Sequence, residues 1–172
     1  FIQGARKQFG IHIEDKDTLK YIGDHTVFLP LTNEMIAILL SQQGFFSSLE
    51  PIRGARAALK RLEKYFEIYI VSAPYPNNPT SYHEKYVWLK TYFHGLEDKL
   101  IGTSSKEAIG GDVLIDDHMA FCKKWKSVQH GLVASLTYPW TDDSIVDINC
   151  PTWHTLATSL ISEFTILRKK AI

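Results

Sequence analysis

The chain has 172 residues, of which 45% are hydrophobic and 22% charged, so it can bury one hydrophobic core and is neither disordered nor fibrous in composition. Its 19 basic and 19 acidic residues cancel, so charge gives no strong signal for nucleic acid as a partner. No apolar run approaches the length of a membrane span, so we expect no membrane partner. Cys122 and Cys150 are the only cysteines; they could pair, but two cysteines in a chain of this length are more typical of a reduced intracellular protein, with cytoplasm and mitochondrion not distinguished.

Helical and strand-like segments alternate from the start of the chain. The spacing of apolar residues predicts a first amphipathic helix at 1–9. A second helix begins after its cap Thr32 and is closed by Gly44. A third helix is predicted at 51–65 and leads into 67–72, a short apolar run typical of a strand buried on both faces.

The alternation continues to the end of the chain. The predicted segments there are a helix from 80 or 81 to 93, strands at 99–102, 112–116 and 131–136, and a helix at 156–167. Strands separated by helices favour an α/β fold with an open, mostly parallel sheet. Because ligands bind beyond the carboxyl ends of the strands in such sheets, the residues just after each strand are candidate site residues.

Two adjacent carboxylates, Asp116 and Asp117, follow the apolar run at 113–115. At a buried strand end they repel each other and lose hydration, and a hard divalent cation would offset this cost. Mg²⁺ takes oxygen ligands and usually needs only one or two protein carboxylates beside phosphate and water. The alternative is that one aspartate caps the next segment while the other is solvated, and the pair alone leaves both interpretations open.

Two more side chains lie where a phosphate could bind. Ser72 ends the strand predicted at 67–72, and its hydroxyl can donate to a phosphate oxygen beside exposed main-chain N–H groups. Lys106 lies ten residues before Asp116 and would neutralise phosphate charge. Taken singly, these residues have ordinary interpretations as a turn serine and a solvated surface lysine.

Together, these residues match three of the four sequence motifs of the haloacid dehalogenase (HAD) superfamily. Over nearly its whole length the chain closely resembles the 5′(3′)-deoxyribonucleotidase family of that superfamily. The segments that carry the resemblance are 44–46, 49–51, 54–55, 72–74, 82–88, 92–93 and 112–117. The Glu-Lys-Tyr-x-Trp run at 84–88 and the Leu-Ile-Asp-Asp run at 114–117 are specific in combination.

The resemblance implies both a fold and a reaction. The expected fold is a single HAD-like α/β domain with a Rossmann-type, mostly parallel sheet, a small helical cap at approximately 5–46 and a core at 47–172. The expected reaction is Mg²⁺-dependent removal of phosphate from nucleoside monophosphates by a 5′(3′)-deoxyribonucleotidase-like phosphohydrolase. A nucleoside monophosphate or phosphate is then the small-molecule partner.

The same resemblance implies a role for each candidate residue. Ser72 binds phosphate, and Lys106 holds phosphate and nucleophile. Asp116 and Asp117 serve the metal, with Asp117 as the direct ligand. Lys85 approaches the phosphate from the helix after Ser72. The residues expected to line a base pocket are Phe45, Phe46 and Tyr75, for which plain core packing is the alternative.

The first HAD motif, Asp-x-Asp-x-(Thr/Val)-Leu, supplies the nucleophile and the general acid/base, and it is not found at the expected place. Asp15 and Asp17 have the spacing, but they lie in the predicted cap. Residues 1–3 align with the family segment directly after this motif, so the first core strand and the nucleophile are expected upstream. The alternative is a catalytically inactive family member that serves as a structural or binding subunit, with a protein partner or larger assembly.

Overall fold

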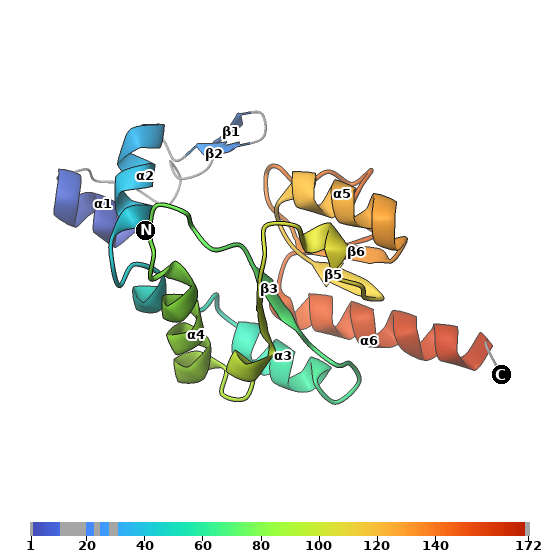
Figure 1. The fold of residues 1–172 in the computed structure, drawn as a ribbon. Helices are drawn as coiled ribbons and strands as arrows, with labels where there is room; N and C mark the ends of the chain where they lie inside the picture. The colour runs from blue at the N-terminus through green and yellow to red at the C-terminus, as the bar shows by residue number, and fades with distance from the viewer. Residues whose placement is uncertain (1, 11–19, 23–24, 28–30, 171–172) are drawn as a thin grey trace. The chain divides into compact units, whose positions relative to one another are not determined.

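The computed structural model describes residues 2–10, 20–22, 25–27 and 31–170, which form two compact units (Figure 1). The first unit contains residues 1–50 and 71–104, and the second contains 51–70 and 105–172. The predicted division into a cap at 5–46 and a core at 47–172 stays a prediction, and Asp15 and Asp17 lie outside the described residues.

The first unit combines helices with two small strand pairs. Its elements are α1 (Ile2–Phe9), β1 (Lys20–Ile22), β2 (His25–Val27), α2 (Asn33–Ser41), η2 (Phe46–Ser48), α4 (Ser81–Tyr92), η3 (Glu97–Lys99) and β4 (Leu100–Gly102). Strand β3 (Ile70–Ser72) lies where the chain passes into this unit, and it pairs with β4. Strands β1 and β2 form an antiparallel pair, which the sequence pattern did not predict.

Helix α2 confirms the predicted cap at Thr32, but the helix ends at Ser41 and not at the predicted Gly44. The Thr32 hydroxyl accepts the N–H of Met35 at 3.2 Å and so satisfies one of the free donors of the first turn. Leu39 is fully buried and forms a small core with Leu31. The partly buried side chains around this core include Phe45, so the end of α2 and the segment after it are fixed by apolar packing.

The second unit is a parallel sheet covered by helices on both faces. Its elements are α3 (Ala55–Leu62), η4 (Lys106–Ala108), β5 (Val113–Ile115), α5 (Met119–Gln129), β6 (Leu132–Leu136), β7 (Ile148–Cys150) and α6 (Trp153–Lys170). The strand order is β5-β6-β7, and both pairings are parallel. The predicted α/β class with parallel strands is therefore confirmed, whereas α5 and β7 were not predicted.

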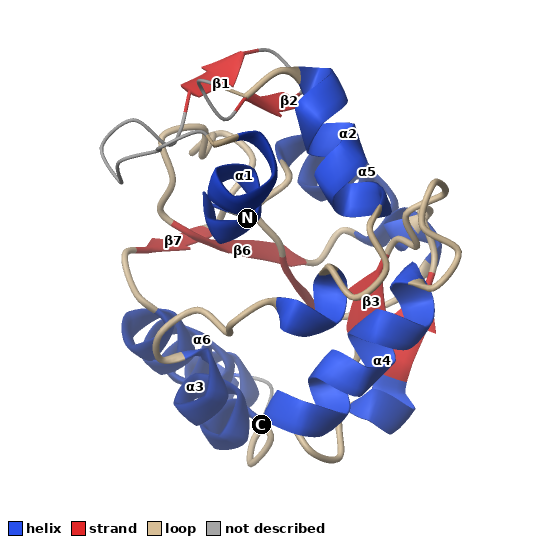
Figure 2. Cartoon of the chain, turned by 90° about the vertical axis from the view of Figure 1, so that its left-hand side faces the viewer, coloured by secondary structure: helices blue, strands red, loops and turns tan. Residues whose placement is uncertain are grey.

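Strand β6 separates two hydrophobic clusters because its side chains alternate between the faces of the sheet. Ala134 packs with Leu62 of α3 and Leu160 of α6. Its neighbour Val133 packs with Trp125 of α5 on the opposite face. Helices α3 and α6 lie side by side in both views (Figures 1 and 2). This two-sided burial explains why the residues of β6 other than Ser135 are apolar. Ser135 is polar but also buried.

Helix α3 is shorter than the helix predicted at 51–65. Gly54 precedes it with a φ of 87°, a left-handed conformation that glycine adopts without strain, and the helix begins at the next residue. Main-chain turns continue after Leu62, but the α-helix itself ends there. Local backbone geometry therefore sets both ends of this helix within the longer amphipathic pattern.

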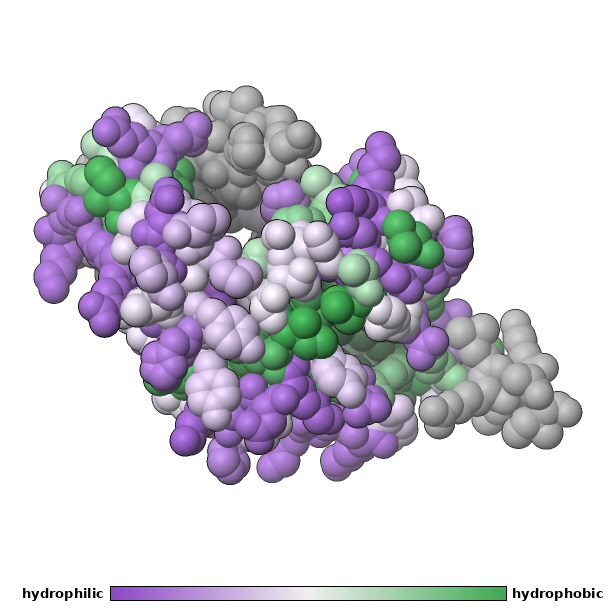
Figure 3. Space-filling model, viewed as in Figure 1, coloured by the Kyte–Doolittle hydropathy of each residue, from purple (hydrophilic) through white to green (hydrophobic). Residues whose placement is uncertain are grey.

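Among the helices of the described chain, none is both long enough and apolar enough to cross a membrane. Hydrophilic side chains predominate along α4 on the face drawn in Figure 3. Among the residues whose side chains are described, the large apolar ones that are exposed are Ile38, Ile52, Tyr65, Tyr69, Tyr82, Val87, Val128 and Ile166. They come from several different elements, which is ordinary for a globular surface.

The turn from α5 into β6 provides a test of packing in the second unit. A Cβ atom on Gly131 would lie 2.6 Å from the Trp125 ring and 2.8 Å from the carbonyl oxygen of Asp112. Main-chain oxygen cannot move aside cheaply, so Gly131→Ala should lower the free energy of unfolding by about 1–3 kcal/mol. Urea denaturation measures this change.

Gly110→Ala is the matched control, because the nearest atom to its added Cβ is a side-chain oxygen at 3.6 Å. The control should change the free energy of unfolding by less than about 0.5 kcal/mol. Equal stability losses in the Gly110 and Gly131 variants would contradict the predicted steric conflict.

Candidate active site

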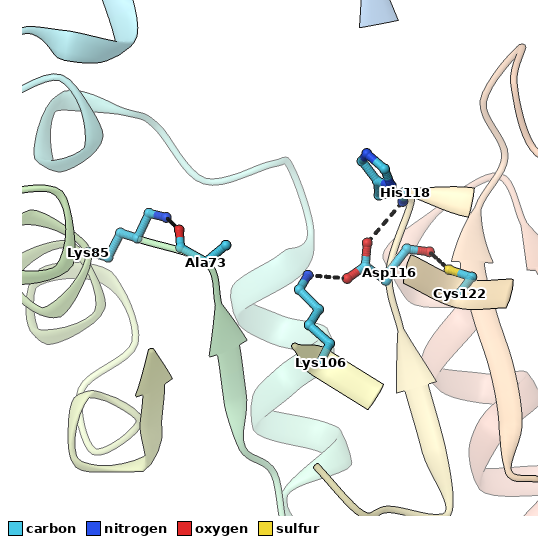
Figure 4. A network of polar contacts seen from close by, with 6 residues as sticks. All are labelled: Ala73, Lys85, Lys106, Asp116, His118 and Cys122. Carbon is cyan, nitrogen blue, oxygen red and sulfur yellow. Dashed lines mark hydrogen bonds and ion pairs between the residues drawn. The ribbon is translucent and has the colours of Figure 1, made fainter. Parts of the chain in front are cut away.

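An ion pair lies at the carboxyl end of β5. Lys106, the first residue of η4, binds the Oδ2 atom of Asp116 through its ammonium group (Figure 4). Both side chains are largely buried, with 13% and 8% of their surface exposed. Asp116 follows β5 directly, and its main-chain N–H donates to Ala134 of β6 at 3.1 Å. The contact brings Lys106 and Asp116 together at the strand end, while their chemical roles stay predictions.

The second oxygen of the Asp116 carboxylate is also held. Its Oδ1 atom accepts the main-chain N–H of His118 at 2.9 Å (Figure 4). The carbonyl oxygen of Asp116 accepts the Cys122 thiol at 3.6 Å, and burial raises the pKa of that thiol to about 12. Cys122 is therefore a protonated packing residue rather than a nucleophile at neutral pH. The carboxylate of Asp116 is fixed from both sides.

Asp117 has a different environment from Asp116. The residue keeps solvent-exposed surface, yet partial burial first and the neighbouring Asp116 charge second raise the pKa of its carboxyl. These two causes outweigh the nearby positive charge of Lys106, so a further cation beside Asp117 would be stabilised. This arrangement favours Asp117 over Asp116 as the carboxylate that holds a metal.

Two aromatic residues that were not predicted as site residues, Trp140 and Tyr138, lie beside the main chain of Asp117 or pack against each other there. The indole N–H of Trp140 donates to the main-chain carbonyl of Asp117 at 3.0 Å. The Trp140 ring stacks on Tyr138 with 4.7 Å between centroids and 4° between planes. Both follow β6 at its carboxyl end, the same kind of position that singled out the acidic pair, so the sequence did carry a signal for them.

The donor set at this strand end fits Mg²⁺ but not a closed protein cage. The described part of the chain contains no group of three or more histidine, cysteine, aspartate or glutamate residues suited to a metal ion. Mg²⁺ does not need such a group, since it commonly uses one or two carboxylates and fills its remaining positions with water and phosphate oxygens. Asp117 would be the direct ligand, with Asp116 already held by Lys106.

A second group of predicted residues lies in the first unit. Ser72 ends β3, and its carbonyl oxygen accepts the N–H of Thr103 at 3.2 Å. The ammonium group of Lys85, in α4, donates to the carbonyl oxygen of Ala73, the next residue after Ser72 (Figure 4). Lys85 is thus held beside the predicted phosphate-binding turn at 72–74, and its approach to a phosphate stays a prediction.

The three predicted aromatic residues form a cluster beside Lys85. Phe45 and Phe46 meet edge to face at 5.2 Å, and Phe46 lies 6.5 Å from Tyr75 between ring centroids. The Lys85 nitrogen lies 4.7 Å from the centre of the Phe46 ring, within range of a cation–π interaction. All three aromatic side chains are partly exposed, and Phe45 also packs against the core of Leu31 and Leu39, so their role in a base pocket stays a prediction.

Glu84, the residue before Lys85, is a buried carboxylate that the sequence analysis quoted without assigning it a role. Only 5% of its surface is exposed. Burial alone would raise the pKa of the Glu84 carboxyl, but hydrogen bonds from a hydroxyl, two main-chain N–H groups and an amide outweigh burial and hold the pKa below its usual range. Glu84 is therefore an ionised group stabilised by neutral donors.

Lys106 provides a stability test, because its removal leaves Asp116 as a largely buried carboxylate without its cation. Lys106→Met should lower the free energy of unfolding by about 3–5 kcal/mol. Lys124→Met is the matched control, since Lys124 pairs with Glu107 but is 61% exposed, and its loss should cost less than about 1 kcal/mol. Urea denaturation of both variants would contradict the prediction if their losses were equal.

Glu84 provides a pH test. Folding lowers the pKa of Glu84, so the ionised carboxylate stabilises the fold at pH values above the pKa that Glu84 has in the unfolded chain, about 4.3. This stabilisation is lost as the pH falls through the lower pKa that Glu84 has in the folded protein. Glu84→Gln removes this titration, so its free energy of unfolding should fall less between about pH 6 and pH 3 than that of the wild type. Urea denaturation across this range checks the difference, and parallel curves would contradict it.

Comparisons with known proteins identify the family of the chain. Residues 1–145 match the family described as "5' nucleotidase, deoxy (Pyrimidine), cytosolic type C protein", a range that includes every predicted site residue. A protein of Staphylococcus epidermidis named "Putative 5'(3')-deoxyribonucleotidase" is 34% identical over 91 residues, which cover 52% of this chain and 50% of the relative. A protein of the same name from Vibrio phage KVP40 is 37% identical over 75 residues, covering 43% and 44%.

A third relative of this name, from Staphylococcus aureus strain Mu50, is 29% identical over 116 residues, which cover 66% of this chain and 61% of the relative. The chain thus spans about half the length of the first two relatives that it matches. The family match extends over most of the chain, and the structure has the α/β fold with parallel strands that the family implies. The chain therefore belongs to the HAD-like 5′(3′)-deoxyribonucleotidase family.

Proposed function

We propose that the protein containing this chain is a phosphohydrolase that removes phosphate from nucleoside monophosphates in a Mg²⁺-dependent reaction. The observation that carries the proposal is the buried Lys106–Asp116 ion pair at the end of β5, followed by a second carboxylate that lacks such compensation. This arrangement concentrates charge at a strand terminus, where α/β proteins bind ligands. The family relationship supports the same reaction.

The chain's own residues would bind the phosphate group. Lys106 is fixed by Asp116, so its ammonium can attract a phosphate without a large loss of side-chain freedom. Ser72 would donate its hydroxyl to a phosphate oxygen at the end of β3. Lys85 would add positive charge from α4, where its ammonium is held by the carbonyl of Ala73. Fixed donors of this kind stabilise charge that develops in the transition state.

Asp117 would hold the Mg²⁺ ion, with Asp116 beside it. A bound Mg²⁺ ion neutralises phosphate charge and orients the phosphoryl group for displacement. The hydrogen bond from Trp140 to the Asp117 carbonyl limits movement of the main chain at the ligand. The chain thus orients its metal-binding carboxylate through the backbone as well as through charge.

The aromatic cluster of Phe45, Phe46 and Tyr75 would contact the base of the nucleotide. Aromatic rings bind nucleobases by stacking and tolerate different bases, since every base presents a π face. The partial exposure of all three rings leaves surface for such a contact. We propose this role for the cluster in place of simple core packing.

The nucleophilic aspartate of the first HAD motif is not assigned to any described residue, so activity is to be measured on the complete protein that contains this chain. The alternative function, an inactive family member that acts as a structural or binding subunit, predicts no turnover in that protein. We propose an intracellular location, which the buried free thiols of Cys122 and Cys150 support.

The metal assignment gives a direct test with phosphate release as the readout. Asp117→Asn removes the charge of the proposed Mg²⁺ ligand, so turnover of deoxyribonucleoside monophosphates should fall by at least about 100-fold. Asp143→Asn, an exposed aspartate in the same unit, is the control and should retain wild-type turnover. Circular dichroism verifies that both variants are folded.

EDTA should abolish activity of the wild type, and added Mg²⁺ should restore it. Unchanged turnover in the Asp117 variant, or full activity in EDTA, would contradict the metal assignment. Absence of turnover in the complete wild-type protein with Mg²⁺ would favour the inactive subunit.

A further inference from the structure

Glu84 connects helix α4 to the aromatic cluster through the main chain. Its Oε1 atom accepts the N–H of Gly44 at 2.8 Å, and its Oε2 atom accepts the N–H of Phe46 at 2.9 Å. Gly44 has a φ of 86°, so the chain turns sharply at the point where the carboxylate binds it. Both oxygens of one buried side chain therefore fix the turn that presents Phe45 and Phe46.

Asn78 extends this connection to the end of α2. Its amide nitrogen donates to the carbonyl oxygens of Gln42 at 3.0 Å and Leu40 at 3.3 Å, and it also reaches Glu84 at 3.4 Å. Only 2% of its surface is exposed. The hydroxyl of Thr80 donates to Glu84 as well. These contacts make a largely buried polar network that spans 40–46 and 78–84, and such networks fix one arrangement when every member has a partner.

The next residue of α4 connects the same helix to the phosphate-binding turn. Lys85 holds the carbonyl oxygen of Ala73, and its nitrogen lies over the ring of Phe46. Glu84 and Lys85 are adjacent, so one turn of α4 fixes both the aromatic cluster and the residue after Ser72. The distance between the proposed base contact and the proposed phosphate contact thus depends on two successive side chains.

We propose that Glu84 is a positioning residue that sets the distance between the aromatic cluster and the phosphate-binding turn, and so selects phosphates that carry a nucleoside. This inference rests on the proposed function and names the specificity element of that site. Glu84 itself is buried and contacts main-chain groups, so it acts through Phe45 and Phe46 rather than on the substrate.

The turn at 44–46 requires a carboxylate at position 84, because each of its two oxygens accepts a main-chain N–H. A glutamine at this position has the same shape, but it offers one acceptor oxygen and directs an NH₂ donor at one of the two main-chain N–H groups. A buried donor left without an acceptor costs free energy, so the turn at 44–46 should move away from α4 in the Glu84→Gln variant. The Lys85–Ala73 contact does not involve Glu84 and should persist.

The test compares binding of deoxyribonucleoside 5′-monophosphates with binding of inorganic phosphate, by calorimetry of the complete protein in EDTA, in which no turnover is expected. Glu84→Gln should weaken nucleotide binding about tenfold or more, while phosphate binding changes less than about twofold. Glu97→Gln is the matched control, since Glu97 is also buried, at 7% exposed, and accepts the main-chain N–H of Gly95. This control should leave both affinities unchanged.

Phe46→Leu and the double variant with Glu84→Gln test the route of the effect. If Glu84 acts through the aromatic cluster, the double variant should bind nucleotide no more weakly than Phe46→Leu does. Equal weakening of nucleotide and phosphate binding in Glu84→Gln, no weakening at all, or fully additive losses in the double variant would each overturn the inference.

Thr80→Ala keeps the inference testable if Glu84→Gln does not fold. This variant removes one donor to Glu84 but leaves both main-chain contacts, so a smaller loss that is confined to nucleotide binding is expected. A Thr80→Ala variant with unaltered or unselective binding would then overturn the inference. A wild-type protein that binds phosphate but no nucleotide would instead overturn the proposed function.

Discussion

The free-energy cost of placing two carboxylate charges at the end of β5 explains the polar contacts around this strand end in the second unit. Asp116 and Asp117 are adjacent, and their mutual repulsion adds to the loss of hydration at a strand terminus. The fold offsets this cost for Asp116 with Lys106 and with the N–H of His118. It leaves the charge of Asp117 partly uncompensated, which would stabilise a cation bound there. A strand end with fully balanced charge would attract a cation more weakly.

The first unit handles buried charge in the opposite way. Neutral donors bind the Glu84 carboxylate, two of them main-chain N–H groups of the turn at 44–46, and together they hold its pKa low. A charge held by a cation can exchange that partner for a ligand, whereas a charge held by main-chain N–H groups is committed to the fold. Glu84 therefore serves the geometry of the turn, whereas Asp117, whose charge is only partly compensated, is the carboxylate proposed to hold a cation.

Strong local patterns in the sequence were sufficient to predict much of the fold. The capping threonine of α2 and the continuous apolar runs of β5 and β6 placed these elements correctly. Helix α5 was missed because lysines interrupt its apolar face, and β7 was missed because the polar Asn149 interrupts its short apolar run. Both depend on burial against β6, a contact between segments that lie apart in the sequence. Local periodicity carries no information on such contacts.

The sequence by itself determined the α/β class, the family, and the candidate residues at the strand ends, because these follow from residue type and spacing along the chain. It could not determine which aspartate is neutralised, since that depends on where the ammonium of Lys106 lies in space. It also could not assign a role to Glu84, which is an ordinary charged helix residue until folding buries it against Gly44 and Phe46. Tertiary structure decided these points because desolvation and hydrogen bonding arise only when distant segments come together.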